Sequence, residues 1–211
     1  FAFMLRPAQA SELSASEQQV IRNAIAASLA AGPEGRTLKA FSTLLRGRIR
    51  AGEGDLLARL ESWMRPDQRG WLFNNETDRL SISSIFGFDM TRVLDDPVIR
   101  TAALMYIFHR TDELLTGDPV MIFLDEGWRL LDDDVFAFFI RDKLKTIRKQ
   151  NGIIGFGTQS AADIARSKAA NTLIEQTSTN IFFPNPKADD ESYATAFRLS
   201  GREVAWIRST P

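Results

Sequence analysis

The sequence predicts an α/β fold, in which a parallel sheet carries helices on both faces and a small all-α unit is added. From Trp71 onward, apolar runs typical of strands alternate with helical patterns, which implies parallel strands joined by right-handed crossovers. Before that point, roughly residues 9 to 69 hold three short amphipathic patterns with no strand between them. We therefore expect an all-α domain over residues 9–69 and an α/β core over residues 70–200.

Composition excludes several classes of protein. The 211 residues are 44% hydrophobic and 25% charged, as in ordinary globular proteins. A net charge of −1 excludes a globally basic nucleic-acid binder, although not a local basic channel. The sequence has no cysteine and one histidine, His109, which excludes disulfides, thiolate chemistry and a multi-histidine zinc site.

The ends and the hydropathy of the sequence predict a cytoplasmic, soluble piece of a longer protein. No run approaches 18 uncharged apolar residues, the length that would predict a membrane span. The sequence begins at Phe1 and no signal-peptide pattern follows, so we expect it to begin inside a longer chain.

Capping residues locate the helices of the first part. Ser14 and Glu17 form a capping-box pattern before a helical run that Gly32-Pro33 ends. Thr37 and Asp55 are expected to begin two further helices.

In the second part, strands and helices are expected in alternation. In chain order we expect a β-rich stretch at 80–88, a long helix from Asp96-Pro97 toward Gly117, a strand buried on both faces at 119–124, a helix from Asp132–Asp134 to a cap at Asn151-Gly152, a strand at 152–157, a helix near 161–170 and a strand at 180–183.

Two acids follow the apolar strand at 119–124. Four or more apolar residues followed by Asp125-Glu126 form the Walker B pattern of P-loop ATPases. At the carboxyl end of a buried strand, Asp125 is placed to hold Mg²⁺ through its water shell, and Glu126 to polarise a water against a γ-phosphate. The alternative is that the acid only caps the next helix.

A second strand end carries Thr158-Gln159-Ser160. If the two strands are parallel neighbours, Gln159 lies close to Glu126, where its amide could contact both the γ-phosphate and the attacking water. The alternative is that Thr158, Gln159 or Ser160 caps the following helix.

Basic residues gather at the end of the helix before that strand, and they include Arg148 and Lys149. One interpretation is a solvated helix end whose charge complements the helix dipole. The other is that Arg148 lies near the sheet edge where phosphates bind and reaches a phosphate there, in a neighbouring subunit's site. We expect His109 to be a packing or capping residue, because no nucleophile or orienting acid accompanies it.

The phosphate-binding loop is missing. No G-x-x-x-x-G-K-[ST] sequence occurs, so the backbone cradle for phosphates is absent from this chain. Either the loop lies upstream of Phe1 in a parent protein, in which case this chain alone is expected to be inactive, or the domain does not use ATP.

Eight short motifs, taken together, resemble the large ATPase of type IV secretion and conjugation machines, the VirB-four/TraC/CagE class. They are Phe86-Gly-Phe-Asp-Met-Thr91, Val93-Leu-Asp-Asp-Pro97, Tyr106-Ile-Phe-His-Arg110, Leu124-Asp-Glu-Gly-Trp128, Leu131-Asp-Asp133, Lys145-Thr-Ile-Arg-Lys149 with Asn151-Gly152, Gly157-Thr-Gln-Ser160 and Pro184-Asn-Pro186. The resemblance implies a RecA-like core of the HerA–FtsK branch with an inserted all-α domain. It also implies Mg-ATP hydrolysis at the subunit interfaces of a homo-oligomer, a hexamer, which works with other secretion components at the inner face of the bacterial membrane.

The same resemblance implies roles for individual residues. Asp125 and Glu126 match the Walker B pair, in which Asp125 would bind Mg²⁺ through water. Gln159 matches the polar residue at the end of the next strand. Arg148 and Lys149 fall in a basic motif at the end of a helix. The leading function is therefore a fragment of a motor ATPase for secretion or pilus assembly. The alternatives are a non-catalytic assembly or docking module derived from an ATPase fold, and a DNA-translocating relative, for which the arginines at 46–50 are the only hint of a nucleic-acid partner.

Overall fold

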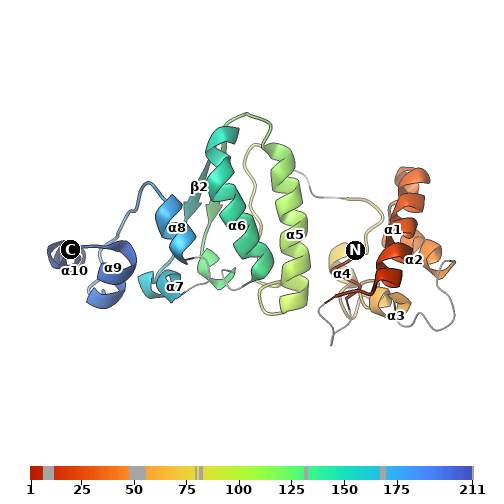
Figure 1. Cartoon of the computed structure of the whole chain (residues 1–211), viewed down its shortest axis with the longest axis horizontal. Helices are drawn as coiled ribbons and strands as arrows, with labels where there is room; N and C mark the ends of the chain where they lie inside the picture. The colour runs from red at the N-terminus through yellow and green to blue at the C-terminus, as the bar shows by residue number, and fades with distance from the viewer. Residues whose placement is uncertain are drawn as a thin grey trace. The chain divides into compact units, whose positions relative to one another are not determined.

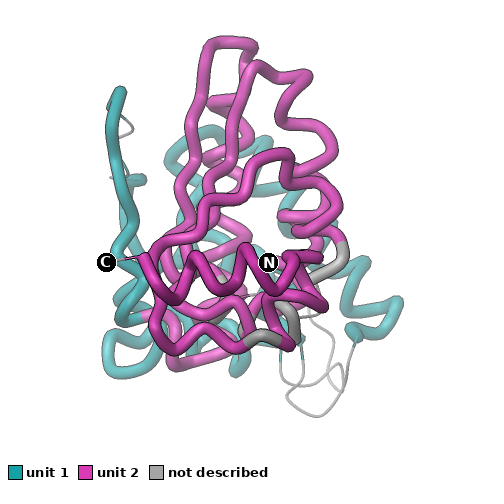
Figure 2. Tube along the Cα trace, turned by 90° about the vertical axis from the view of Figure 1, so that its left-hand side faces the viewer, with its two compact units in different colours: residues 1–92 teal, residues 93–211 magenta. Residues whose placement is uncertain are grey.

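The computed structural model describes residues 1–6, 12–47, 56–78, 80, 83–130, 133–166 and 170–210. It divides into two compact units, residues 1–92 and 93–211 (Figure 2). Among the described residues, no helix is long and apolar enough to cross a membrane.

The first unit is helical throughout its described part. Its elements are α1 (Ala15–Ala30), the 3₁₀ turn η1 (Pro33–Gly35), α2 (Leu38–Arg46), α3 (Leu56–Glu61) and α4 (Gly70–Phe73) (Figure 1). The predicted strand-like stretch at 80–88 was wrong for its described residues, 80 and 83–88, none of which is in a strand.

Two of the three predicted caps of this unit are confirmed. Ser14 Oγ accepts a hydrogen bond from Glu17 N at 3.2 Å, and Ser14 N donates to Glu17 Oε2 at 2.8 Å, which is the reciprocal capping box. Thr37 Oγ1 accepts from Ala40 N at 3.1 Å. The third predicted cap, Asp55, lies outside the described residues.

A buried tryptophan and an ion pair hold the first unit together. Trp63 is 1% exposed and donates its indole N–H to Met4 O at 3.0 Å. Glu17 on α1 pairs with Arg59 on α3. Burial alone would raise the pKa of Glu17, but hydrogen bonds from Arg59 and Ser14 outweigh it and hold that pKa below its ordinary value. The carboxylate is therefore ionised at neutral pH, and the pair links two helices far apart in sequence.

The second unit is mixed α/β. Its elements are α5 (Pro97–Leu114), β1 (Val120–Leu124), η2 (Gly127–Leu130), α6 (Asp134–Thr146), η3 (Ile147–Gln150), β2 (Gly152–Phe156), α7 (Ala161–Arg166), α8 (Ala170–Gln176), α9 (Asp190–Phe197) and α10 (Gly201–Ser209) (Figure 1). β1 and β2 pair in parallel, with Val120 opposite Gly152 and Leu124 opposite Phe156. The predicted parallel pairing of these two strands is confirmed.

Helix α6 is attached to α5 through polar and aromatic contacts. Asp133 caps α6 by accepting from Val135 N and Phe136 N, and its other oxygen accepts from Thr101 of α5 at 2.6 Å. The rings of Phe108 and Phe139 stack with centroids 3.6 Å apart. Because the aspartate is buried, these hydrogen bonds supply the partners that burial requires and fix the two helices against each other.

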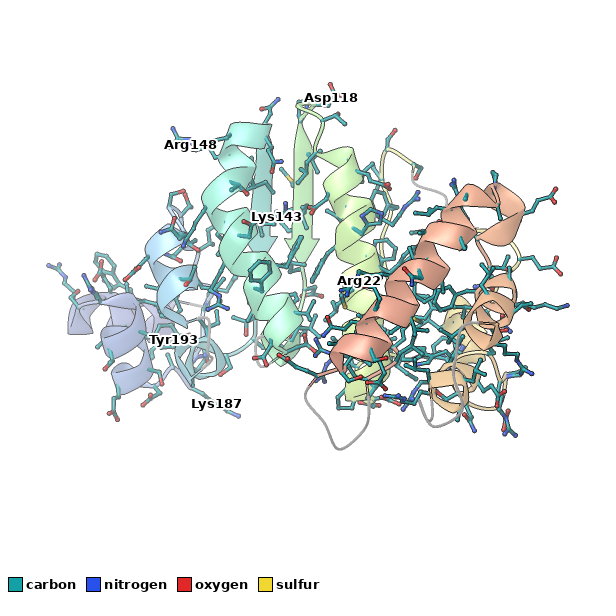
Figure 3. All side chains as sticks on the ribbon, turned by 45° about the vertical axis from the view of Figure 1, so that its right-hand side comes forward. Arg22, Asp118, Lys143, Arg148, Lys187 and Tyr193 are labelled. Atoms are coloured by element: carbon teal, nitrogen blue, oxygen red, sulfur yellow. The ribbon has the colours of Figure 1, made fainter. Side chains whose placement is uncertain are left out.

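One face of the two-stranded sheet is bare, in contrast to the prediction that β1 is buried on both faces. Met121, Phe123 and Ile153 point to this face and are 61%, 74% and 60% exposed. The other face, with Ile122 and Ile154, is half-buried, and α6 crosses in front of the strands in Figures 1 and 3. Parallel strands become buried on both faces only when crossover helices cover both, and no described element covers this one.

The predicted strand at 180–183 was also wrong. The described residues of this segment lie outside any strand, and Ile181 and Phe183 are exposed. Phe182 instead packs against Tyr193 and Val204, in the small core formed by α9 and α10. A strand forms only where a neighbouring strand satisfies its backbone groups, and no described strand lies beside this segment.

Candidate functional site

The candidate site lies where the two parallel strands end. Gly157 N donates to Leu124 O at 2.9 Å, which continues the sheet pairing one step past β2. The segment Asp125-Glu126 therefore leaves β1 beside the segment that follows Phe156. The structure thus brings the predicted acids and the Gly157–Gln159 segment together at one edge of the sheet, where ligands of parallel α/β sheets bind.

Asp125 is exposed at this edge. Gly157 is the nearest residue of the next strand end, and a Cβ placed on it would lie only 3.3 Å from Asp125 Oδ1. The missing side chain leaves the carboxylate accessible to a hydrated cation. An exposed oxygen donor with free space around it fits Mg²⁺, which keeps most of its waters and takes few protein ligands.

No larger metal site accompanies this carboxylate. Within the described ranges, no group of three or more histidine or carboxylate side chains is placed to hold a metal ion. A magnesium ion at Asp125 would therefore depend on its waters and on phosphate oxygens for the rest of its coordination.

Glu126 is half-buried and its backbone has φ = 50°, in the left-handed region. Glutamate has no side-chain feature that favours this region, unlike glycine or asparagine. Strained backbone of this kind is found at functional sites, where the surrounding structure holds it in place. Among the described residues, Asn151 and Arg198 share this left-handed conformation.

This strain gives a stability prediction. Glu126→Gly should have a free energy of unfolding about 0.5–1 kcal/mol above that of Glu126→Ala. Both variants lose the glutamate side chain and its contacts, and relief of left-handed strain, about 1–2 kcal/mol, exceeds the entropic cost of glycine. Urea unfolding of the 211-residue chain measures the difference. Arg198→Gly should exceed Arg198→Ala by a similar amount, because Arg198 is an exposed residue with φ = 56° outside the site. A Glu126→Gly variant no more stable than Glu126→Ala would contradict the assignment of strain to Glu126.

Gln159 lies in the short turn that follows β2. Its side chain is exposed and takes no part in the hydrogen bonds described within the chain. Thr158 Oγ1 accepts from Ser160 N at 3.2 Å and donates to Ser160 O at the same distance, so Thr158 closes this turn. Thr158 thereby performs the local turn-forming role, and the Gln159 amide remains available to a ligand at the carboxyl ends of the strands.

Arg148 lies at the wrong end of the sheet for the predicted contact within its own chain. It belongs to η3, which precedes β2, and the residue between them, Asn151, accepts from Val120 N at 3.3 Å at the start of β1. Figure 3 shows Arg148 and Asp118 at the same end of the sheet, that of the amino ends of the strands, whereas Asp125 and Gln159 follow their carboxyl ends. The expectation that its guanidinium lies near the phosphate edge was wrong, because the helix end and the strand end are separated by the whole length of β2.

The other basic residues and the histidine belong to helical elements and not to the strand ends. Lys149 is exposed in η3, next to Arg148. His109 is exposed on α5, with Nε2 3.6 Å from Glu113 Oε1. Arg46 pairs with Glu61 at 3.2 Å, and the remaining arginines of the 46–50 segment lie outside the described residues.

Sequence reasoning missed the glycine after the acid pair. Gly127 is buried, and a Cβ placed on it would lie 2.7 Å from Cε2 of the Phe156 ring. The only signal in the sequence was a glycine directly after two acids, which by itself also fits an ordinary turn. The contact with Phe156 depends on the register of β1 against β2, which the sequence does not specify.

No protein-family model matches the chain. The type IV secretion system protein virB4 of Bartonella henselae is 42% identical over 175 residues, which cover 82% of the chain and 22% of that relative. PtlC of Bordetella pertussis, also a type IV secretion system protein, is 36% identical over 183 residues, 82% of the chain and 22% of the relative. The virB4 protein of Brucella abortus is 32% identical over 93% of the chain and 25% of its own length. The chain therefore spans about a quarter or less of these relatives, and over most of its own length it is a homologue of the VirB4 and PtlC proteins of type IV secretion systems.

Proposed function

We propose that this chain is the C-terminal part of the ATPase domain of a longer protein that energises type IV secretion or conjugative pilus assembly. The observation that carries the proposal is the strand-end arrangement. Asp125 and Glu126 leave one parallel strand directly beside the Gly157–Gln159 segment that leaves the next. Homology to type IV secretion proteins supports it independently of that geometry.

The residues present fit Mg-ATP as the cofactor of the longer protein. Mg²⁺ bound there would neutralise phosphate charge and orient the triphosphate. Asp125 would hold the water shell of the ion, and the space left by Gly157 gives that shell room. Glu126 would accept the proton of the attacking water, and Gln159 would orient that water through its amide.

The rest of the proposed assembly rests on the family resemblance. A RecA-like core would supply the phosphate-binding loop, because the printed sequence has no G-x-x-x-x-G-K-[ST]. A homo-oligomer, a hexamer, at the inner membrane would place each nucleotide at a subunit interface. Arg148, which is remote from the site of its own chain, would then act only on a nucleotide held by a neighbouring subunit.

Asp125→Asn in the longer protein tests this function. The affinity for Mg-ATP should fall by roughly 10–100-fold, the usual effect of losing a group that supports a bound metal, while affinity for ATP without Mg²⁺ stays unchanged. Titration calorimetry with and without EDTA measures both affinities. Asp118→Asn is the matched control, because Asp118 precedes the same strand and lies at its other end (Figure 3).

An Asp125→Asn variant with the parental dependence on Mg²⁺ would contradict the cofactor assignment. Failure of the parental protein itself to bind Mg-ATP would favour the non-catalytic docking module instead. The missing phosphate-binding loop is the observation that keeps this second function in consideration.

A further inference from the structure

The turn between β1 and η2 is packed against the ring of Phe156, the last residue of β2. A Cβ on Gly127 would lie 2.7 Å from Cε2 and 3.0 Å from Cζ of that ring, whereas ordinary van der Waals contact begins at 3.4 Å. The same Cβ would lie 3.3 Å from Cβ of Leu124. Any side chain larger than hydrogen at residue 127 would therefore push against the end of the sheet on two sides.

The backbone conformation of Gly127 does not by itself require glycine. Its φ is not in the left-handed region; the strained residue is Glu126, one position earlier, with φ = 50°. Glycine is needed at 127 because the ring of Phe156 occupies the space of a side chain. The strained φ of Glu126 and the close approach of Gly127 to the Phe156 ring thus occur in consecutive residues.

Two fixed points lie on either side of Glu126. On one side, Leu124 O accepts from Gly157 N at 2.9 Å, which anchors the end of β1 to the end of β2. On the other side, Gly127 is held against the Phe156 ring. Between these points the chain turns at residues 125 and 126, and Glu126 adopts the left-handed conformation within this turn. A strained conformation persists where surrounding contacts over-determine it, and these are such contacts.

We propose that Gly127 and Phe156 are positioning residues, which hold the backbone of Glu126 in its left-handed conformation and so direct its carboxylate toward the attacking water. This inference rests on the proposed ATPase function. It adds that the Phe156 ring, at the end of β2, fixes the position of the Glu126 carboxylate without itself acting on the substrate. Displacing a catalytic group by about 1 Å costs roughly 10²-fold in rate, which is the size of effect at stake.

Gly127→Ala in the longer protein tests the proposal. The turnover number for ATP should fall by roughly 10²-fold while the affinity for Mg-ATP stays at the parental value, because the base moves and the nucleotide contacts do not. Phe156→Leu should by itself lower turnover by a smaller factor, because the turn loses its support. Combining the two should recover most of the loss, since leucine lacks the ring atoms that the new methyl group would meet. Steady-state hydrolysis and titration calorimetry give the two readouts.

Gly35→Ala is the matched control for general damage to packing. A Cβ there would lie 2.8 Å from Cβ of Ala31 and 3.3 Å from the backbone oxygen of Ser28, a similar clash in the other unit of the chain. We expect Gly35→Ala to lower the unfolding temperature as Gly127→Ala does, but to leave the turnover number of the folded protein unchanged. A purely structural role for Gly127 would make the two variants behave alike.

Parental turnover in Gly127→Ala would overturn the proposal, and so would a turnover loss that is equal in Gly35→Ala. If Gly127→Ala does not fold, Phe156→Leu decides alone: reduced turnover at parental affinity supports the proposal, and parental turnover overturns it. Failure of the proposed function would look different, because the parental protein itself would then neither bind nor hydrolyse Mg-ATP.

Discussion

Glu126→Gln in the longer protein is expected to bind Mg-ATP normally and to lose turnover by roughly 10²–10⁴-fold, the range for removal of a general base. The amide has nearly the shape of the carboxylate, so contacts with the nucleotide are preserved. It cannot accept the proton of the attacking water, so the chemical step slows. The structure supports this assignment because the residue is half-buried at the strand end in a strained turn, beside the segment that carries Gln159.

Nucleotide affinity and hydrolysis must be measured on the same preparation, so that a loss of binding is separated from a loss of chemistry. Glu175→Gln is the matched control, because Glu175 is an exposed glutamate on α8 of the same unit and is not part of the strand ends. Parental hydrolysis in Glu126→Gln would show that Glu126 is not the base. A loss of equal size in Glu175→Gln would show that the assay reports general damage.

Arg148→Ala is expected to lower turnover by about 10³–10⁵-fold, the effect of a transition-state arginine, if the arginine serves the nucleotide of a neighbouring subunit as we propose. A solvated helix-end cation would instead contribute about 0–1 kcal/mol to stability and nothing to catalysis. Arg148 is exposed at the amino ends of the strands, so its removal should leave folding and the nucleotide site of its own chain intact. Hydrolysis by the assembled oligomer measures the effect.

Mixing Arg148→Ala with Glu126→Gln subunits gives a test of the trans assignment. A mixed interface can pair the intact arginine of one chain with the intact glutamate of the other, so part of the activity should return. Lys149→Ala, which removes the adjacent exposed cation of η3, should keep parental turnover. Unchanged turnover in Arg148→Ala, or no recovery on mixing despite verified subunit exchange, would refute a role across the interface.

The sequence by itself determined the local elements of this protein. Ser14, Thr37 and Asp96 cap their helices as their spacing predicts, because a capping hydrogen bond involves residues only two or three positions apart. The two apolar runs at 120–124 and 152–156 form strands, and the acids that follow the first of them lie at its end. These features depend on short-range chemistry, which a single sequence contains in full.

The tertiary structure alone decided the features that depend on neighbours in space. Whether a parallel strand is covered on both faces depends on which elements surround it, and Met121 and Phe123 are exposed because no described element packs on them. Arg148 lies at the same end of the sheet as Asp118, and not at the end that Asp125 follows, because parallel pairing places the residues before β2 beside the start of β1. The contact of Gly127 with Phe156, and the strained turn that it supports, follow from the register of two strands that are separated by a helix. Register is set by packing across the whole unit, so no pattern of adjacent residues contains it.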